Sequence, residues 1–353
     1  MSTTKRIDSL RYAALTPLVS VLLSSRNGAR YLEESLESLA AQTYPELEIV
    51  AVDDGSTDET AVILSRFAAR HGRTRILRTD GIGLAGALHL AAAEAKGTLF
   101  ARQDDDDRSG PERIARQVDF LHLHPDVGVV GTAAVRIDAS GATVGTYDIP
   151  LDPDSMATAL RRGTPFVHGS VLIRREAYVA AGGYREAFQA AQDVDLWLRV
   201  PKEYHFANLP EALYAWREHP GGVFARARDS QLFFAATARA FAEERRAAGP
   251  GLEPPSHPRT DSIALLAESD SPEAFLEQYA RADRVAVRLG ELLVREGRTE
   301  EARPMLRRAA RTGRSAPEAL LWLALSYPAA WTPRARRVRS APTAHRAAKE
   351  MKP

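Results

Sequence analysis

The chain has 353 residues and a formal net charge of +1, and its length favours two domains of about 150 residues each. It contains no cysteine, which excludes thiol catalysis, zinc ribbons, iron–sulfur clusters and a disulfide framework, and fits a reducing compartment. No apolar run approaches the roughly 20 residues of a membrane helix, and residues 1–16 lack the pattern of a signal peptide.

Charge is unevenly distributed along the chain. Residues 331–353 carry a net charge of +6 and residues 1–16 carry +2, so that the body, 17–330, carries −7. An acidic body with a basic tail indicates two regions with different functions.

Residues 17–128 alternate between strand and helix patterns. The predicted strands are 18–24, 48–52, 75–77 and 98–102, and the predicted helices are 31–42, 58–70 and 84–95. This rhythm predicts a parallel sheet with helices on both faces and ligands at the carboxyl ends of its strands.

The second half has a different texture. Predicted strands at 127–137 and 141–147 are typical of a meander, another strand is predicted at 170–174, and helices are predicted at 175–181, 193–200 and 229–246. The predicted organisation is a tail at 1–16, a main domain at 17–246, a Pro/Gly-rich linker at 247–259, a helical region at 260–330 and a basic tail at 331–353.

Two acids follow the second predicted strand. Asp53 and Asp54 precede a glycine turn, and Thr57 or Asp58 can cap the next helix. A cap needs only one acid, and adjacent carboxylates repel each other. We therefore expect Asp53 to bind a ligand, by accepting a hydrogen bond from a nucleotide base or a ribose hydroxyl.

Four acids, Asp104–Asp107, follow the fourth predicted strand. A solvated loop is the simple explanation, but this run comes directly after apolar residues. A divalent cation would relieve the repulsion between the carboxylates, whose oxygens are the ligands that Mg²⁺ and Mn²⁺ select, often together with substrate phosphates. The run therefore predicts a site for a metal and a diphosphate.

Other patterns are weaker. Asp193 and Asp195 do not share a helix face, so one can face a cleft while the other caps the helix or is solvated. His219 alone is more often structural than a ligand. Residues 81–86 match the dinucleotide-binding pattern G-x-G-x-x-G, but they follow the third strand instead of the first, and four adjacent acids do not suit a ribose clamp. We therefore do not expect a dehydrogenase.

Together these motifs resemble those of family 2 glycosyltransferases over about residues 17–223. The runs that carry the resemblance are Ser20–Gly28, Gln42–Pro45, Glu48–Asp58, Ala101–Asp107, Pro111–Ile114, Gly128–Gly131, His168, Arg174–Ala177, Gly182–Tyr184 and Gln192–Arg199. The resemblance implies an α/β class, the GT-A nucleotide-sugar-binding fold, with a sheet that is parallel first and mixed later, flanked by helices and followed by a small α-helical region.

The resemblance also implies roles for individual residues. Asp53 would bind the nucleotide base, and Asp104 and Asp106 would form the ends of the D-x-D motif, near the ribose and on the metal. Asp193 would be the general base for the acceptor hydroxyl, and His219 would complete the metal or diphosphate site. Further expected nucleotide-sugar contacts are Ser24, Arg26, Asn27, Asp54, Gly83 and Asp105. Candidate contacts to acceptor or donor are Asp107, His168 and Trp197.

Three positions depart from the family pattern. Gln192 replaces the acid that usually precedes the catalytic Asp193, which removes a negative charge and predicts a less raised pKa for Asp193. Ser24-Ser25-Arg26 replace the usual Pro or Thr and aromatic residue, and His89 stands where Asn is frequent. The preference for base or diphosphate can differ accordingly.

The implied function is inverting, metal-dependent transfer of a sugar from a nucleotide-diphosphate sugar to a hydroxyl, with Mn²⁺ or Mg²⁺, in glycan, polysaccharide or glycolipid assembly. A UDP-sugar is the favoured donor, GDP- and TDP-sugars are alternatives, and the acceptor would be a glycan or lipid-linked. A competing hypothesis is a catalytically weak scaffold that binds nucleotide sugars. A nucleotidyltransferase is disfavoured, because no basic glycine-rich signature follows the first strand.

The helical region resembles a single tetratricopeptide repeat, with helices at 284–295 and 299–310 and small residues at Gly290 and Ala302. Such folds need about three repeats for independent stability, so we prefer a helical hairpin packed on the catalytic domain, with partner binding as the alternative. The basic tail can meet an anionic membrane surface or remain solvated. We expect no nucleic-acid partner and a cytoplasmic protein, with peripheral attachment to the inner membrane face as an option.

Overall fold

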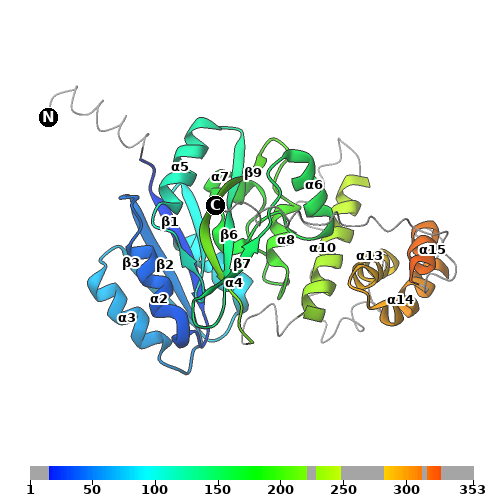
Figure 1. Ribbon diagram of the computed structural model, residues 1–353, viewed down its shortest axis with the longest axis horizontal. Helices are drawn as coiled ribbons and strands as arrows, with labels where there is room; N and C mark the ends of the chain where they lie inside the picture. The colour runs from blue at the N-terminus through cyan, green and yellow to red at the C-terminus, as the bar shows by residue number, and fades with distance from the viewer. Residues whose placement is uncertain (1–15, 221–227, 248–281, 312–315, 327–353) are drawn as a thin grey trace, which may run out of the picture.

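The computed structural model describes residues 16–220, 228–247, 282–311 and 316–326 (Figure 1). Most of the predicted N-terminal tail, nearly all of the Pro/Gly-rich linker, the first part of the helical region and the basic tail lie outside the described residues.

The first half of the domain is the predicted parallel sheet. Its elements are β1 (Val19–Ser25), α2 (Ala29–Ala40), β2 (Leu47–Asp54), α3 (Thr60–Arg70), β3 (Thr74–Thr79), α4 (Gly83–Glu94) and β4 (Leu99–Asp104). The strands lie in the order β3-β2-β1-β4, and each pair is parallel. All seven elements match predicted ones, so the alternating pattern was a sufficient guide here.

The sheet becomes mixed in the second half. Its elements are β5 (Arg108–Ser109), α5 (Arg113–Leu123), β6 (Val127–Ile137), β7 (Thr143–Tyr147), α6 (Pro153–Arg162), the 3₁₀ turn η1 (His168–Ser170), β8 (Leu172–Arg174), α7 (Arg175–Ala180), α8 (Gln192–Trp197) and β9 (His205–Arg217). The sheet continues as β8-β6-β9-β5, with β8 antiparallel to β4 and β6, and with β7 paired to β6 alone.

The sequence did not predict β5, α5, α6 or β9. The strand β9 contains Pro210, which argues against a strand because proline has no amide hydrogen to donate. The structure accommodates it in an irregularity of the β6–β9 pairing, where Leu209 pairs with Thr132 and Ala212 pairs with Ala133. The predicted meander of 127–137 and 141–147 is confirmed, because β7 pairs antiparallel with β6, whereas the unpredicted β9 runs parallel to β6.

Successive residues of the central strands point to opposite faces, and each face has its own core. Val21 and Leu23 pack with α2, α3 and α5, whereas Leu22, Val50 and Val52 pack with α4. This two-sided burial explains why the strands read as continuous apolar runs. It leaves only the strand ends for polar chemistry.

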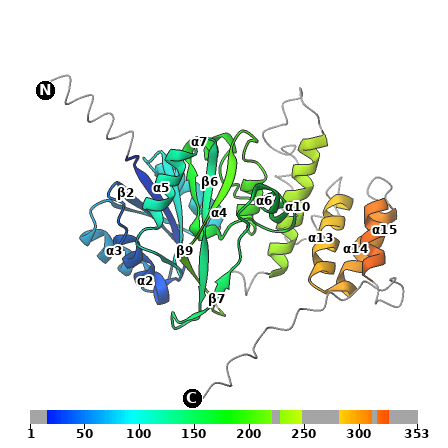
Figure 2. The ribbon, with the colours of Figure 1, turned by 45° about the horizontal axis from the view of Figure 1, so that its top comes forward.

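The C-terminal helices are α10 (Arg228–Ala247), α13 (Ala282–Arg295), α14 (Thr299–Arg311) and α15 (Ala316–Leu325). The helix α10 lies between the sheet and the other three (Figure 2). Val285 and Leu289 of α13 share one core with Phe233 of α10 and with Phe188 and Val194 of the main domain. The predicted helical hairpin is thus present and packed on the main domain.

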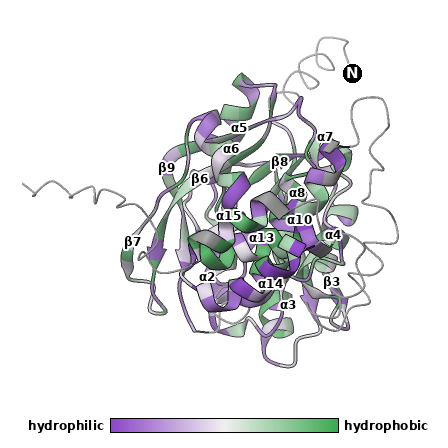
Figure 3. Ribbon diagram, turned by 90° about the vertical axis from the view of Figure 1, so that its right-hand side faces the viewer, coloured by the Kyte–Doolittle hydropathy of each residue, from purple (hydrophilic) through white to green (hydrophobic). Residues whose placement is uncertain are grey.

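Small residues allow the two hairpin helices to approach closely, as predicted. A Cβ atom at Gly290 would lie 2.6 Å from the Leu306 side chain, and Ala302 is fully buried. Figure 3 looks onto these helices, where hydrophobic and hydrophilic segments are interleaved. Across the described residues, no helix combines the length and the apolar character needed to cross a membrane.

Candidate active site

The carboxyl ends of the parallel strands bring the predicted residues together. In the β1–β2 pairing Ser25 lies opposite Asp53, and in the β1–β4 pairing Ser24 lies opposite Asp104. Asp53 in turn lies opposite Arg78 of β3. Asp53 and Asp104, which are 51 positions apart in the chain, therefore share one edge of the sheet, where α/β folds bind ligands.

The carboxylate of Asp53 is buried and only partly used by the protein. Its Oδ1 accepts a hydrogen bond from the Ser56 amide at 3.0 Å, while its Oδ2 accepts none from the described residues. The Arg78 Nε lies 3.7 Å from this Oδ2, and Asp53 is 1% exposed. A buried, oriented oxygen with spare acceptor capacity suits a donor group of a nucleotide base.

Asp54, by contrast, is used by the protein itself. Its Oδ1 accepts hydrogen bonds from the Thr79 hydroxyl at 2.6 Å and the Ile82 amide at 2.7 Å, and its Oδ2 accepts one from the Gly83 amide at 2.9 Å. Gly83 adopts a positive φ of 79° at the start of α4. We therefore assign Asp54 and Gly83 to holding this loop, instead of the direct nucleotide contact that we expected.

The loop after β1 is tied to the loop after β2. The Asn27 amide donates to the Ser56 hydroxyl at 3.0 Å, and the Asn27 Oδ1 accepts from the Thr57 amide at 2.9 Å, with Asn27 at a φ of 54°. Ser24 is buried at the end of β1, and the exposed Arg26 guanidinium lies beside Gly81. Arg26 thus brings a cation to the rim of the strand ends.

The acid loop, Asp104–Asp107, has an internal brace. The Gln103 side chain is buried, and its Nε2 donates to the Asp107 carbonyl at 3.0 Å and the Asp104 carbonyl at 3.1 Å. Asp105 Oδ2 accepts from the Ser25 hydroxyl at 2.5 Å and lies against Gly28, where any Cβ atom would overlap it. Gly28 is thus needed for the close approach of Asp105 to the β1 loop.

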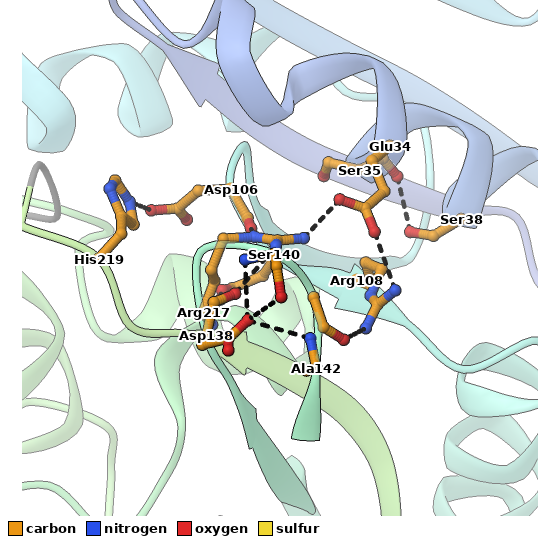
Figure 4. A network of polar contacts seen from close by, with 12 residues as sticks. Glu34, Ser35, Ser38, Asp106, Arg108, Asp138, Ser140, Ala142, Arg217 and His219 are labelled. Carbon is orange, nitrogen blue, oxygen red and sulfur yellow. Dashed lines mark hydrogen bonds and ion pairs between the residues drawn. The ribbon is translucent and has the colours of Figure 1, made fainter. Parts of the chain in front are cut away.

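Each end of the D-x-D pattern has a different partner. Asp104 Oδ1 lies 2.5 Å from the buried Arg102 guanidinium, whereas Asp106 Oδ2 lies 2.9 Å from His219 Nε2 (Figure 4). Burial and the neighbouring Asp104 raise the pKa of Asp106. Burial and Asp106 raise the pKa of Asp105 to about 7. The loop therefore holds a charge excess that a cation would stabilise.

The donor set at Asp106 and His219 fits a divalent ion that takes mixed oxygen and nitrogen ligands, such as Mn²⁺. Their hydrogen bond places the two ligand atoms at 2.9 Å, on the rim of the acid loop. Within the described ranges no group of three or more His, Asp or Glu side chains could hold a metal. The described protein would thus supply two ligands, and diphosphate oxygens and water would supply the others.

Arg217, which the sequence analysis did not single out, positions the acid loop. Its backbone amide donates to Asp107 Oδ1 at 2.7 Å, and its Nε donates to the Asp106 carbonyl at 2.7 Å (Figure 4). Its guanidinium also pairs with Glu34 at 2.5 Å and lies 4.5 Å from the centre of the Tyr31 ring. Arg217 lies two residues before His219, and this proximity in the sequence was the signal that could have identified it.

Asp107 is a brace and not a surface contact. It is 1% exposed, and burial, together with Asp106 and Asp104, raises its pKa well above the usual value. Its Oδ1 accepts the Arg217 amide. Its Oδ2 accepts no hydrogen bond from the described residues, so the expected contact of Asp107 to acceptor or donor stays a prediction.

Asp193 and Asp195 separate as predicted, but by a different means. Asp193 lies half-buried in the first turn of α8, without a hydrogen bond to any residue that the structure describes. Asp195 is 1% exposed and forms ion pairs with Arg185 and Arg199. It is therefore neither a cap nor solvated, and only Asp193 is available to a ligand.

His168 and Trp197 lie side by side but differ in availability. The His168 Nε2 lies 2.8 Å from the Tyr184 hydroxyl, and burial and Arg102 lower the pKa of His168, so its imidazole is neutral. Trp197 is 1% exposed, with its ring 5.2 Å from that of Phe166. We therefore place Trp197 in the core, contrary to the expected substrate contact.

These features define an α/β protein whose candidate ligand site lies at the acidic carboxyl ends of its parallel strands. The profile of the family described as Glycosyl transferase family 2 matches residues 20–181. EpsE, a protein of Bacillus subtilis strain 168 named as a glycosyltransferase, is 39% identical over 207 residues, which cover 57% of this chain and 73% of EpsE. The amylovoran biosynthesis glycosyltransferase AmsE of Erwinia amylovora is 32% identical over 200 residues, 56% and 74% of the two chains.

Solved structures share the fold. Staphylococcus aureus TarS 1–349 in complex with UDP-GlcNAc superposes with a TM-score of 0.56 at 17% identity, over 88% of this chain and 90% of that one. The mannosyltransferase PcManGT of Pyrobaculum calidifontis, in complex with GDP-Man and Mn²⁺, superposes with a TM-score of 0.50 at 22% identity, over 86% and 78%. The chain belongs to glycosyl transferase family 2, has the GT-A fold and is a glycosyltransferase, as predicted.

Proposed function

We propose that this glycosyltransferase moves a sugar from a nucleotide-diphosphate sugar to an acceptor hydroxyl with inversion at the anomeric carbon. The observation that carries this proposal is the contrast between the bound carboxylates of the acid loop and the Asp193 carboxylate, which has no hydrogen-bond partner among the described residues. One region is built to hold charge, and the other can accept a proton.

In this proposal the strand ends bind the donor. Asp53 accepts a hydrogen bond from the base through its free Oδ2, and Asp104 lies near the ribose. Arg26 and Arg78 are exposed cations at the same edge, where they offset the negative charge of a diphosphate. The donors in the solved relatives, UDP-GlcNAc and GDP-Man, support a nucleotide sugar without selecting its base.

Asp106 and His219 would hold a divalent ion, Mn²⁺ or Mg²⁺, in this proposal. When bound, such an ion acts as a Lewis acid toward the leaving diphosphate. The protein's own contribution is to hold the acid loop in place through Gln103 and Arg217. The Mn²⁺ in the PcManGT structure supports a divalent cofactor.

Asp193 acts as general base in the proposed reaction. It takes the proton of the acceptor hydroxyl as the oxygen attacks the anomeric carbon and the nucleoside diphosphate leaves. One carboxylate is sufficient, because a single displacement inverts the centre without a covalent intermediate. The position of Asp193 on α8, whose neighbour Asp195 is fixed by two arginines, keeps it in a defined place.

We further propose that the enzyme assembles a polysaccharide or related glycan, supported by the name of its relative AmsE. Residues 17–246 would be the catalytic unit, at the cytoplasmic face of the membrane, with the basic tail 331–353 toward anionic lipid. The helices of 260–330 that the structure describes would stabilise this unit through α10 and α13.

A thermal-shift screen tests the donor assignment. UDP-, GDP-, TDP- and CDP-sugars are added with and without Mn²⁺, and we expect one base to raise the melting temperature more with metal than without. Transfer or hydrolysis of the same donors is then measured. Donor binding without any turnover would favour the alternative of a nucleotide-sugar-binding scaffold.

A further inference from the structure

One face of the β6–β7–β9 part of the sheet carries a row of aromatic residues. Ala134 of β6 lies opposite Tyr147 on one side and opposite Tyr214 on the other. Residues that lie directly opposite each other in neighbouring strands point to the same face, so Tyr147 and Tyr214 share a face with Ala134. Trp216, two residues after Tyr214, points to this face as well.

This row leads from the donor edge outward. The Tyr214 hydroxyl accepts a hydrogen bond from the Asp104 amide at 3.2 Å. Trp216 packs next to Tyr214 in the small core that also contains Ala134 and Val167. The Tyr147 ring meets Trp216 edge to face, with ring centres 5.6 Å apart and planes at 84°.

Tyr147 is the exposed end of the row. Its side chain is 37% exposed on β7, a strand that pairs only with β6 in the part of the chain that the structure describes. Trp216 fixes the tilt of the Tyr147 ring, because edge-to-face contacts are directional. Tyr147 therefore presents an aromatic surface of fixed orientation to solvent.

Polar groups flank this aromatic surface. Arg136, opposite Trp216, forms a two-pronged ion pair with Glu218, with both hydrogen bonds at 2.8 Å. Both side chains are more than one-third exposed and keep donors and acceptors toward water. An aromatic surface with a planar polar rim matches a pyranose ring, which has an apolar C–H face and hydroxyls at its edge.

The predicted base is an electrostatic neighbour of this surface. Burial and the negative charge of Asp193 raise the pKa of Tyr147, and the same carboxylate acts on His168, which follows Val167 of the small core. Geometry agrees with this, because the His168 ring lies 6.3 Å from that of Trp197 on α8, the helix that carries Asp193, and Tyr214 contacts Asp104 at the donor edge.

We propose that Tyr147 and Trp216, with the Arg136–Glu218 pair at their rim, form an acceptor subsite that stacks a hexopyranose ring and directs one of its hydroxyls to Asp193. This inference rests on the proposed function, because it takes Asp193 as the base. It names the acceptor class as a saccharide with a pyranose at its reacting end.

The test is binding of simple pyranosides, which does not depend on turnover. Methyl glycosides of glucose, galactose, mannose and N-acetylglucosamine are added to the full chain with UDP and Mn²⁺. Saturation-transfer NMR then measures which ring protons contact the protein. We expect at least one glycoside to bind through one C–H face, and Tyr147→Ala to weaken that binding about three- to tenfold.

Two matched variants control this test. Tyr147→Phe keeps the ring, so it should bind like the natural protein. Thr146→Ala removes an exposed neighbour that points to the other face of β7 and should also change nothing. Equal melting temperatures of all three variants confirm that they fold.

The outcomes separate the subsite from the proposed function. Binding that is absent in the natural protein, or unchanged in Tyr147→Ala, overturns the subsite even if Asp193→Asn is inactive. If Tyr147→Ala loses binding while Asp193→Asn retains full transfer, the subsite holds and the assignment of the base fails.

Discussion

In the acid loop every carboxylate contacts the protein, and at Asp193 no hydrogen-bond partner occurs among the described residues. The four loop partners are Arg102 for Asp104, Ser25 for Asp105, His219 for Asp106 and the Arg217 amide for Asp107. This difference separates two proposed tasks within one fold, cation binding and proton transfer. Carboxylates that are held in place can bind a cation without rearranging, whereas a base must keep its oxygen atoms free to accept a proton.

The largest expected effect comes from Asp193→Asn. The amide cannot take a proton, so transfer should fall about 10²- to 10⁴-fold, the usual contribution of a general base. Nucleotide binding and melting temperature should not change, because the described residues make no hydrogen bond to this side chain. Steady-state kinetics and calorimetry with nucleotide check both expectations; near-normal turnover would show that another group is the base.

Asp195→Ala, two residues further along the chain, should instead change the stability of the protein. It leaves Arg185 and Arg199 buried without their carboxylate, which should cost about 3–5 kcal/mol of stability. Urea unfolding measures the loss. A stability within 1 kcal/mol of the natural protein, on the order of an exposed ion pair, would contradict the buried-pair assignment.

The same ion pairs predict a dependence of stability on pH. Burial raises the pKa of Asp195, but Arg199 and Arg185 outweigh it, so the pKa lies below the usual 3.8. The unfolded chain then binds more protons in acid. The contribution of Asp195 is complete above about pH 4 and is lost as pH falls further. Unfolding at pH 3 and pH 6 measures it, and Asp195→Ala should show a smaller difference between the two.

Asp106→Asn should affect metal-dependent binding more than folding. The amide is a poorer metal ligand than the carboxylate. Nucleotide affinity in the presence of Mn²⁺ should therefore fall about ten- to a hundredfold, which is the loss typical of replacing a residue that supports a metal ligand. Affinity without metal should change little. Titration calorimetry with and without Mn²⁺ compares the two conditions, and equal losses in both would assign Asp106 to the nucleotide instead of the metal.

The smallest effect is expected at Asp107. Asp107→Ala leaves the buried Arg217 amide without its acceptor, which should cost about 1–3 kcal/mol of stability. Asp107→Asn keeps an oxygen in that place and should lose less. Thermal unfolding of the two variants measures the difference; identical losses would show that volume, and not the hydrogen bond, matters at this position.

How much could be predicted varies with the range of the interaction. The parallel half was predicted in element order and type, because its central strands are buried on both sides, α2 and α3 are amphipathic and α4 is mostly apolar, and all of these are local patterns. The strand β9 was missed, because its pairing with β6 bypasses Pro210 by an irregularity that no local pattern signals. Arg217 was missed for the same reason, since its partners Glu34 and Asp138 lie far away in the chain.

The acidic motifs after the strands predicted a site for a ligand and a metal, whereas the general base was predicted from the family resemblance; both stay predictions. Asp53 was expected to bind a ligand because a helix cap needs only one of two adjacent acids, whereas the roles of Asp106 and Asp193 were implied by the family resemblance. The same reasoning from the sequence did not distinguish residues that face a ligand from neighbours that face the protein. Asp54, Asp107 and Trp197 have the residue types of a site, yet the structure turns each of them toward the protein.

The sequence by itself determined the family, the alternation of strands and helices, and the charge excess of the body, because these depend on residue type and short spacing. The tertiary structure alone decided which carboxylates contact the protein and that Asp193 accepts no hydrogen bond from the described residues, and it placed Tyr147 beside Trp216. Those outcomes depend on partners brought together from distant strands, whose directions are set by sheet register and packing.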